Sequence, residues 1–365
     1  MLNSALSLLK VIESHGFKAY IVGGFARDLY LNRKSVDIDI TTNATPKDLQ
    51  IIFPNSLISQ DKYGSVSLTY KKIRFEITTF RKELKYENHR QPVKIKYINN
   101  LKEDLLRRDF TINTMCIDVD GNMIDLLNIK NDLDKKVIRV VGKARKKLKE
   151  DSLRILRAIR FATILNFELD PKLKKYIKKY GYLVNKLSYY RKKEELDKIF
   201  LSPNIKYGIN LLVELDLLKH LDISNLPNVV ITNSIIGIWA QLDYKNYVFP
   251  AHEKQMIDDI REILDKDILD KNILYKYGLY VCEVAGEIKG IDYKQIVKNY
   301  NNLQIHSITD INIKAKEIVE ILDKPFGPYL KDIFNNLEYA LINDLITNDN
   351  NSLREYIIKN YKTIN

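Results

Sequence analysis

The sequence predicts an α+β protein, with a mixed sheet and helices in the N-terminal part and helices alone after it. Short apolar runs that end at glycines or other turn residues recur as far as residue 126. From Asp132 onward the apolar residues recur at helical spacing. A chain of 365 residues is too long for one core, so we expect about two to four packed units.

Composition narrows the class of protein. The sequence contains no run of about 18 apolar residues, so it predicts no membrane span. The N-terminus lacks the features of a signal peptide and predicts an amphipathic helix over residues 3–16. Cys116 and Cys282 lie far apart and the five histidines are scattered, which favours a reducing cytoplasm over a disulfide framework or a zinc site. The net charge of +12 permits a polyanionic partner, and no obligate protein partner is evident.

A glycine pair follows the first predicted strand. The apolar run 20–22 ends at Gly23 and Gly24, and Arg27 follows within one helical turn. Glycines remove Cβ atoms where a polyphosphate must approach the backbone, and the start of a helix offers free N–H groups. Taken alone, such a pair is more often an ordinary turn.

Two aspartates lie in the next apolar run. On a strand, Asp37 and Asp39 share one face, while Val36, Ile38 and Ile40 point into a core. Neighbouring carboxylates repel each other and occur together mainly where divalent cations bind. The pair alone could be a solvated strand face. Together with the glycines it predicts a nucleotide-triphosphate site with two-metal chemistry.

Further elements complete the expected sheet. Thr45 and Pro46 predict the start of a short helix. Strands are expected at residues 65–70, 73–79, 115–119 and 123–126. In the second of these, Glu76 faces away from Phe75 and Ile77. It is either a third acid of the site or a solvated strand residue.

Three polar segments follow, and the last two of them could be either functional or purely structural. Residues 81–97 predict a polar loop. Arg108, Asp109 and Asn113 could belong to a binding motif or to a capped helix start with exposed charges. Residues 150–161 predict one amphipathic helix whose polar side carries Glu150, Asp151, Arg154, Arg157 and Arg160, which could equally be a salt-bridged surface helix.

The order of these motifs resembles the polymerase-beta-like nucleotidyltransferases. GGFARD followed by DIDITTNATP is similar to the class II tRNA nucleotidyltransferases (CCA-adding enzymes) and the related bacterial poly(A) polymerases. RRDFTIN and EDSLRILRAIRF are similar to two further motifs of this family. A later motif departs from the family pattern, because Tyr190 replaces a glutamate, and we expect Arg191 and Glu195 to form a structural clasp. The resemblance is close over roughly the first 200 residues and weaker beyond them.

The resemblance implies a polymerase-beta-like head with a mixed sheet, followed by an all-helical neck, body and tail. We expect the catalytic head at residues 1–135 and a neck for base selection at 136–200. The body is expected at 201–275 and a tRNA-binding tail at 276–365.

The resemblance also assigns roles to residues. Catalysis is assigned to Asp37, Asp39 and Glu76, and the binding of two Mg²⁺ ions to the first two of these. Binding of the nucleotide triphosphate and ribose is assigned to Gly23, Gly24, Arg27, Arg108, Asp109 and Asn113. Base selection is assigned to Asp151, Arg154, Arg157 and Arg160.

The implied activity is the transfer of CMP and AMP from CTP and ATP to the 3′ end of tRNA, whose acceptor arm is the expected partner. Alternatives are an enzyme that adds only A or only CC, a poly(A) polymerase, or an inactive RNA-binding protein. The polar segment 81–97 argues against CC-only addition, because CC-adding relatives have it shortened. The repelling aspartate pair argues against an inactive protein.

Overall fold

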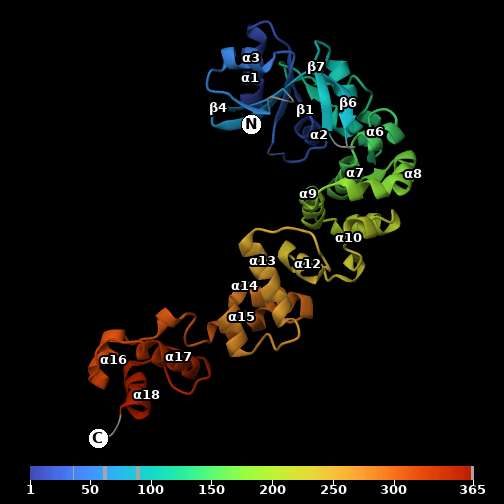
Figure 1. Cartoon of the computed structure of the whole chain (residues 1–365). Coiled ribbons are helices and arrows are strands. Elements are labelled where there is room, and N and C mark those ends of the chain that lie inside the picture. Colours follow the sequence, from blue (N-terminus) through green and yellow to red (C-terminus); the bar gives the residue numbers. More distant parts are fainter. Residues whose placement is uncertain (36, 61–63, 88–90, 363–365) are drawn as a thin grey trace. The chain divides into compact units, whose positions relative to one another are not determined.

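The computed structural model describes residues 1–35, 37–60, 64–87 and 91–362. The chain divides into two compact units (Figure 1). The N-terminal unit comprises residues 1–227 and 245–247, and the C-terminal unit comprises residues 228–244 and 248–365. Among the described residues, no helix is long and apolar enough to cross a membrane.

A seven-stranded mixed sheet lies in the N-terminal unit, with the strand order β3-β4-β5-β2-β1-β8-β9. Strands β2 and β5 are parallel, and the other neighbouring pairs are antiparallel. The strands are β1 (Ala19–Val22), β2 (Asp39–Thr42), β3 (Leu57–Gln60), β4 (Ser65–Tyr70), β5 (Ile73–Thr79), β8 (Cys116–Ile117) and β9 (Met123–Ile124). The predicted mixed sheet is confirmed.

Helices α1 (Leu2–Ser14), α2 (Gly24–Tyr30) and α3 (Pro46–Ile52) accompany this sheet. Thr45 caps α3 as expected. Its hydroxyl accepts a hydrogen bond from the Asp48 N–H at 3.3 Å, and the Asp48 carboxylate accepts one from the Thr45 N–H at 2.8 Å. Each side chain thereby satisfies a backbone donor that the helix start leaves without a partner.

Residues 81–97, expected to be a loop, form an antiparallel hairpin instead. Its strands are β6 (Arg81–Glu87) and β7 (Gln91–Tyr97). Val93, Ile95 and Tyr97 alternate with polar residues in the sequence, and this period of two favours a strand. The prediction gave too much weight to the polar content. Residues 88–90 of this segment lie outside the described residues.

The rest of the N-terminal unit is mainly helical, with one short parallel strand pair, β10 (Val137–Ile138) and β11 (Glu168–Leu169). Its helices are α4 (Leu101–Arg107), α5 (Lys130–Asp134), α6 (Ala144–Glu150), α7 (Leu153–Leu165), α8 (Pro171–Tyr180), α9 (Tyr189–Phe200), α10 (Ile205–Glu214) and α11 (Leu218–Leu221), and short 3₁₀ turns occur at Thr111–Asn113 and Gly181–Lys186.

The single helix predicted over residues 150–161 is wrong. Helix α6 ends at Glu150 and α7 begins at Leu153, while Asp151 has an extended backbone (φ −143°, ψ 106°). The Asp151 Oδ1 accepts a hydrogen bond from the Leu153 N–H at 3.0 Å. An aspartate that binds the backbone two residues ahead competes with helical hydrogen bonding, and this interrupts the helix.

Described residues of the C-terminal unit form helices and no strand. They are α12 (Ile235–Gln241), α13 (Ala251–Ile263), α14 (Lys271–Lys289), α15 (Tyr293–Asn301), α16 (Ala315–Leu322), α17 (Tyr329–Ile342) and α18 (Asn350–Tyr361). A buried cluster that includes Ile318, Leu337 and Leu353 joins the last three helices.

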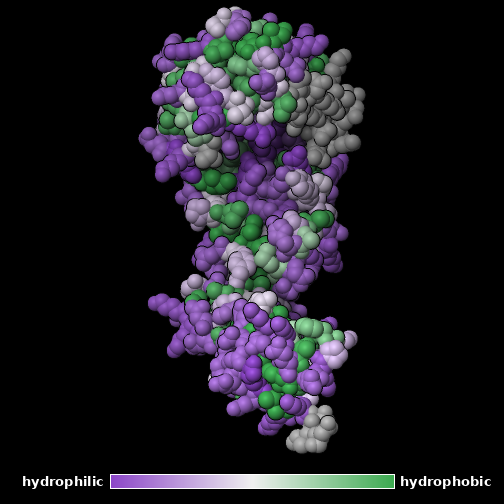
Figure 2. All heavy atoms as spheres, turned by 90° about the vertical axis from the view of Figure 1, so that its left-hand side faces the viewer, coloured by the Kyte–Doolittle hydropathy of each residue, from purple (hydrophilic) through white to green (hydrophobic). Residues whose placement is uncertain are grey.

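On the face of the protein that Figure 2 shows, hydrophilic side chains predominate, with smaller hydrophobic areas among them.

Candidate active site

Asp39 and Glu76 lie opposite each other on adjacent strands. Strand β2 pairs in parallel with β5, and the register places Asp39 beside Glu76. Asp37 lies two residues before the start of β2. Asp37 and Asp39 are exposed, whereas Ile38 and Ile40 are buried. The predicted alternation is confirmed, although β2 begins only at Asp39. The strand register places Glu76 beside Asp39 and leaves its role in the site a prediction.

Electrostatics at Asp39 suit a cation site. Although the residue is exposed, desolvation by the surrounding protein raises its pKa, and the Asp37 and Glu76 carboxylates raise it further, while Arg108 opposes both effects. A bound divalent cation would relieve this repulsion through hard oxygen ligands. Within the described ranges, no group of three or more His, Cys, Asp or Glu side chains lies close enough together to hold a metal ion. The carboxylates of Asp37 and Asp39 suit a divalent cation in charge and in donor type.

Gly23 lies beside the carboxylate of Asp39. It has a φ of +84°, which L-residues with side chains rarely adopt, and it precedes α2. A Cβ atom on Gly23 would lie 3.3 Å from the Asp39 Oδ2, and one on Gly24 would lie 3.6 Å from an Arg27 nitrogen. The glycine pair therefore keeps space free between the carboxylates and Arg27.

A chain of hydrogen bonds runs from Arg27 to Arg157. The Arg27 Nη1 donates to the Asn113 Oδ1 at 2.9 Å, and the Asn113 Nδ2 donates to the Asp109 Oδ1 at 3.3 Å. The Arg157 Nε donates to the Asp109 Oδ2 at 2.8 Å. Four predicted site residues from α2, the turn after α4, and α7 are thereby brought together.

Phe161 gathers three arginines around its ring. The guanidinium carbons of Arg27, Arg157 and Arg160 lie 5.6, 5.4 and 4.4 Å from its centroid. The ring stacks edge-on against Phe110, with centroids 5.5 Å apart. Sequence analysis quoted Phe161 within a motif without giving it a role. An aromatic ring concentrates cations at one place through its negative face.

Asp104 is a second residue that the sequence analysis missed. Its carboxylate is fully buried and accepts hydrogen bonds from the Arg107 Nε at 2.8 Å and the Arg108 Nη2 at 3.2 Å. It also accepts from the Arg81 N–H at 3.2 Å and the Thr41 hydroxyl at 3.3 Å. Asp104 therefore links Arg108 to strand β2 and to the first residue of the hairpin. An acidic residue in a charged helix gave no signal of this burial.

Asp151 and Arg154 lie at the junction between α6 and α7. Burial raises the pKa of Asp151, while Arg154 opposes this shift. Arg154 is buried, and its Nη1 donates to the Glu150 Oε2 at 3.3 Å and to the Lys147 carbonyl oxygen at 2.9 Å. The two predicted base-selecting residues are thus neighbours, but they do not lie on one helical face.

Arg160 takes part in a clasp that the sequence analysis assigned to other residues. Its Nε lies 3.2 Å from the Glu195 Oε2, and both side chains are buried. Arg191 instead pairs with Glu194 at 3.0 Å. The predicted Arg191–Glu195 clasp is wrong, because Glu195 faces α7 rather than its own helix. Arg160, a predicted site residue, is therefore occupied by a structural contact.

Three kinds of group make up this site. They are the carboxylates of Asp37, Asp39 and Glu76, the guanidinium groups of Arg27 and Arg108, and the carboxylate–guanidinium pair of Asp151 and Arg154. Acidic oxygens suit divalent cations, and guanidinium groups suit phosphate oxygens. A carboxylate beside a guanidinium accepts and donates hydrogen bonds along one edge of a ligand. A ligand that carries a polyphosphate at one end and a hydrogen-bonding ring at the other matches these groups.

Comparison with known protein families gives three consecutive matches. Residues 19–139 match the "Poly A polymerase head domain", and residues 166–224 match the "Probable RNA and SrmB-binding site of polymerase A". Residues 241–357 match domain 2 of tRNA nucleotidyltransferases. The first match contains Asp37, Asp39 and Glu76.

Curated relatives match over nearly the whole chain. A CCA-adding enzyme of Anoxybacillus flavithermus is 30% identical, with 99% of this chain and 98% of the relative covered. One of Lactococcus lactis subsp. cremoris is 32% identical, with 94% and 93% covered.

Solved structures of CCA-adding enzymes are also similar to this chain. The CCA-adding enzyme of Bacillus stearothermophilus in complex with CTP superimposes with a TM-score of 0.81 at 25% identity, covering 98% of this chain and 96% of that one. The Thermotoga maritima CCA-adding enzyme complexed with tRNA has the same fold, with a TM-score of 0.68 at 22% identity and 98% and 95% covered.

Proposed function

This chain belongs to the CCA-adding enzyme family, and we propose that it adds CMP and AMP from CTP and ATP to the 3′ end of tRNA. The reaction is a nucleotidyl transfer in which the 3′ hydroxyl of the tRNA attacks the α-phosphate and pyrophosphate leaves. The named activity of the full-length relatives and the CTP complex of the Bacillus enzyme support the proposal.

Asp37 and Asp39 are proposed to hold two Mg²⁺ ions, with Glu76 beside Asp39 as a further acid of the site. Bound metal would lower the pKa of the attacking hydroxyl and neutralise charge on the triphosphate and on the leaving pyrophosphate. The carboxylates supply the negative charge that this requires, and Gly23 leaves room for phosphate beside Asp39.

Guanidinium and amide groups are proposed to bind the rest of the nucleotide. Arg27 and Arg108 bind triphosphate oxygens, with Gly23 and Gly24 leaving the backbone accessible. Asp109 and Asn113 hold the ribose. Arg157 positions Asp109 through their ion pair, and the bond from Arg27 to Asn113 keeps the triphosphate and ribose groups in register.

Base selection is proposed for Asp151 and Arg154, with Arg157 and Arg160 in supporting positions around Phe161. An ionised carboxylate only accepts hydrogen bonds, and a guanidinium only donates them. Cytosine and adenine each present an amine donor beside a ring-nitrogen acceptor, so both satisfy the pair. Uracil and guanine present a carbonyl beside a ring N–H, which leaves buried groups unpaired. Each such mismatch costs about 1–3 kcal/mol.

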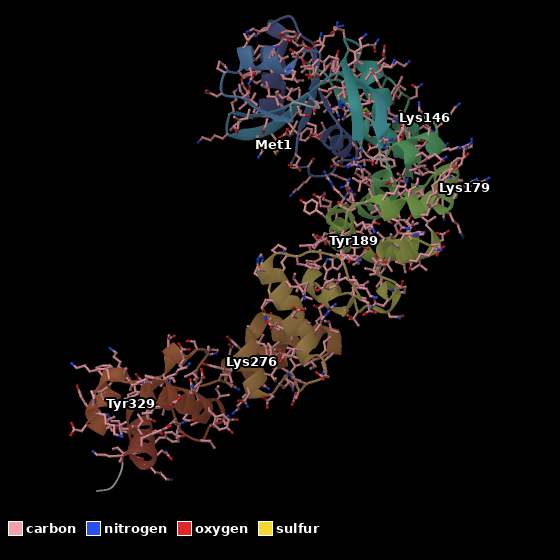
Figure 3. The ribbon with its side chains drawn as sticks, viewed as in Figure 1. Met1, Lys146, Lys179, Tyr189, Lys276 and Tyr329 are labelled. Atoms are coloured by element: carbon pink, nitrogen blue, oxygen red, sulfur yellow. The ribbon has the colours of Figure 1, made fainter. Side chains whose placement is uncertain are left out.

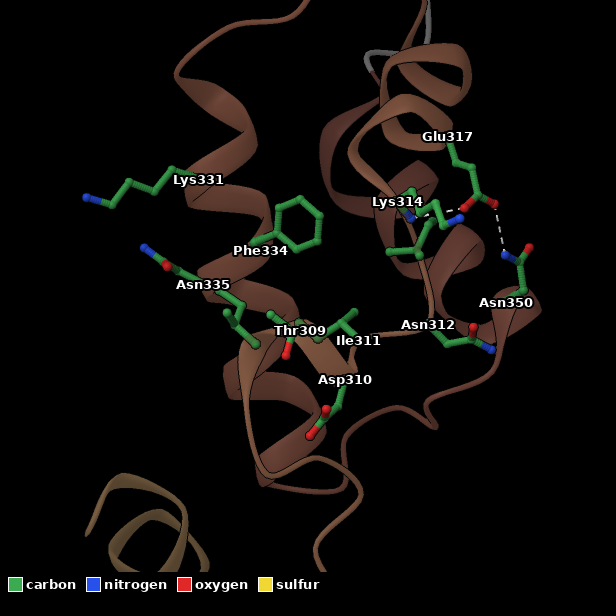
Figure 4. A pocket seen from close by; sticks show the side chains of 12 residues that line it. Thr309, Asp310, Ile311, Asn312, Lys314, Glu317, Lys331, Phe334, Asn335 and Asn350 are labelled. Carbon is green, nitrogen blue, oxygen red and sulfur yellow. Dashed lines mark hydrogen bonds between the residues drawn. The ribbon is translucent and has the colours of Figure 1, made fainter. Parts of the chain in front are cut away.

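The proposal retains the division into head, neck, body and tail at 1–135, 136–200, 201–275 and 276–365. The tail is proposed to contact tRNA through phosphates and shape, because an A-form groove hides the base edges. A hollow of about 700 Å³ in the C-terminal unit offers polar groups for such contact, with Lys331, Asn335 and Phe334 on one wall and Asn312 and Asn350 on the other (Figure 4). Two buried free cysteines suit a cytoplasmic location.

The observation that carries the proposal is the linked set Arg27–Asn113–Asp109–Arg157, which connects the acid end of the site with helix α7. An inactive RNA-binding protein would not need to maintain repelling acids at one end of this set. The hairpin β6–β7 is retained, which argues against CC-only addition.

The test uses three tRNA transcripts, ending at the discriminator base, at C and at CC, each incubated with labelled CTP or ATP and Mg²⁺. We expect CMP on the first two transcripts and AMP on the third. Incorporation of AMP alone, and only on the third, would identify an A-adding enzyme. Long A tails on any RNA would identify a poly(A) polymerase.

A further inference from the structure

Lys147 is a buried lysine outside every motif considered so far. It lies on α6 and is 9% exposed. Its Nζ donates hydrogen bonds to the carbonyl oxygens of Leu106, Arg107 and Arg108 at 3.1, 2.8 and 3.0 Å. All three donors of the ammonium group are therefore used on one short stretch of backbone.

This stretch is the end of α4 and the start of the turn that carries Arg108 and Asp109. The last carbonyl groups of a helix have no partner within the helix and form its negative end. Lys147 satisfies them from another helix. It thereby holds the backbone on which the proposed ribose- and phosphate-binding residues are mounted.

The main chain of Lys147 contacts Arg154, one of the proposed base-selecting residues. The Arg154 Nη1 donates to the Lys147 carbonyl oxygen at 2.9 Å. Arg154 and Lys147 belong to different helices, on either side of the break at Asp151. One residue thus joins the turn after α4, through its side chain, to the first turn of α7, through its main chain.

We infer that Lys147 is a positioning residue that holds the base-selecting Arg154 at a set distance from the ribose-binding turn. This inference rests on the proposed function. A lysine that only capped α4 would stabilise the fold without affecting which base is bound. A lysine that joins the two subsites affects both nucleotide affinity and base preference.

The charge of Lys147 offers a readout specific to this role. Burial lowers its pKa to about 8, and Arg154 on α7 lowers it as well, while Glu150, Glu83 and Asp109 oppose the shift. Lys147 also lines a hollow of about 490 Å³, and we expect its proton to exchange with solvent there. Other charged residues that line this hollow include Lys82, Glu103, Arg107, Lys143 and Lys146. Above this pKa the amine loses its charge and one donor.

The first experiment measures Kd for CTP and for UTP by calorimetry, without tRNA, at pH 7. Lys147→Met should weaken CTP binding at least about tenfold and reduce the preference for CTP over UTP by a similar factor. Lys146→Met is the matched control (Lys146 is labelled in Figure 3). Lys146 is 76% exposed and its Nζ lies 3.7 Å from the Glu150 Oε1, and an exposed lysine in such a pair contributes little, so both values should stay within about twofold. A folded Lys147→Met variant with parental affinity and preference would overturn the inference.

A second variant covers the case in which Lys147→Met does not fold. Arg stays charged at every relevant pH. Between pH 7 and 9, CTP binding by the parent should weaken more than binding by Lys147→Arg. Identical pH profiles would overturn the inference. If the parent binds CTP but adds nothing to tRNA, the proposed function fails, whereas the comparison of Kd values still decides the role of Lys147.

Discussion

Asp109 and Arg157, which are 48 residues apart in the sequence, form an ion pair that ties the turn after α4 to helix α7. Burial alone would raise the pKa of Asp109. The Arg157 guanidinium and the Phe110 N–H outweigh this effect and hold the pKa well below its usual range. The Asp109–Arg157 pair therefore belongs to the candidate site and also holds helix α7 against the turn after α4.

Arg157→Met should lower the free energy of unfolding by about 1–3 kcal/mol at pH 7, because it leaves a partly buried carboxylate without its cation. The pKa of Asp109 is depressed on folding, so its stabilisation is complete above the ordinary aspartate pKa of about 3.9. It is lost as the pH falls below that value. Chemical denaturation at several pH values should show the gap between parent and variant closing in acid. A gap independent of pH would contradict this account.

Disruption of the Arg160–Glu195 clasp should affect stability far more than disruption of the neighbouring surface pair. Glu195→Gln leaves the buried Arg160 uncompensated and should lower the free energy of unfolding by about 3 kcal/mol. Arg191→Met removes an exposed pair with Glu194 and should change it by less than about 1 kcal/mol. Equal effects of the two changes would restore the original assignment of the clasp.

Asp151→Ala should relax the exclusion of UTP and GTP while lowering kcat/KM for CTP and ATP. Arg154→Ala should depress the use of both correct nucleotides, because the guanidinium donates to the ring-nitrogen acceptor that cytosine and adenine share. Kinetics with all four triphosphates on tRNA primers check both predictions. If Asp151→Ala discriminates as sharply as the parent, the base is selected elsewhere.

Shortening of the hairpin β6–β7 should spare CMP addition and impair the final AMP addition. We expect the hairpin to help the site change nucleotides as the tRNA end grows. The Arg81 N–H at its first residue donates to Asp104, so the shortened variant must keep Arg81. Single-turnover assays on tRNAs ending at C and at CC separate the two steps. Equal loss of both would indicate a distorted site instead.

Local patterns predicted the acid end of the site, and long-range contacts explain the errors. The period of a strand correctly placed Asp37 and Asp39 on the exposed side of their run. The pairing of β2 with β5 then brings Glu76 beside Asp39. The resemblance to a family motif predicted an Arg191–Glu195 pair, whereas Glu195 pairs with Arg160 of a different helix. A helical wheel also ignores side chains that bind backbone, and so it missed the break at Asp151.

The buried polar residues were beyond sequence reasoning for the same reason. Asp104 and Lys147 sit in charged, surface-like segments of the sequence. Their partners are backbone and side-chain groups from other elements, which only the folded chain brings near. No local pattern distinguishes such residues from solvated ones.

Sequencing of product ends tests the central claim most directly. A tRNA that lacks its last three nucleotides is incubated with CTP, ATP and Mg²⁺, with the parent or with Asp39→Asn, whose folding is checked by thermal melting. The account predicts that the parent adds C, C and A and then stops, and that the variant is slower by at least about a hundredfold, because it loses a metal-binding charge at nearly constant shape. Unextended ends with the parent, extended A tails, or parental activity in the variant would contradict it.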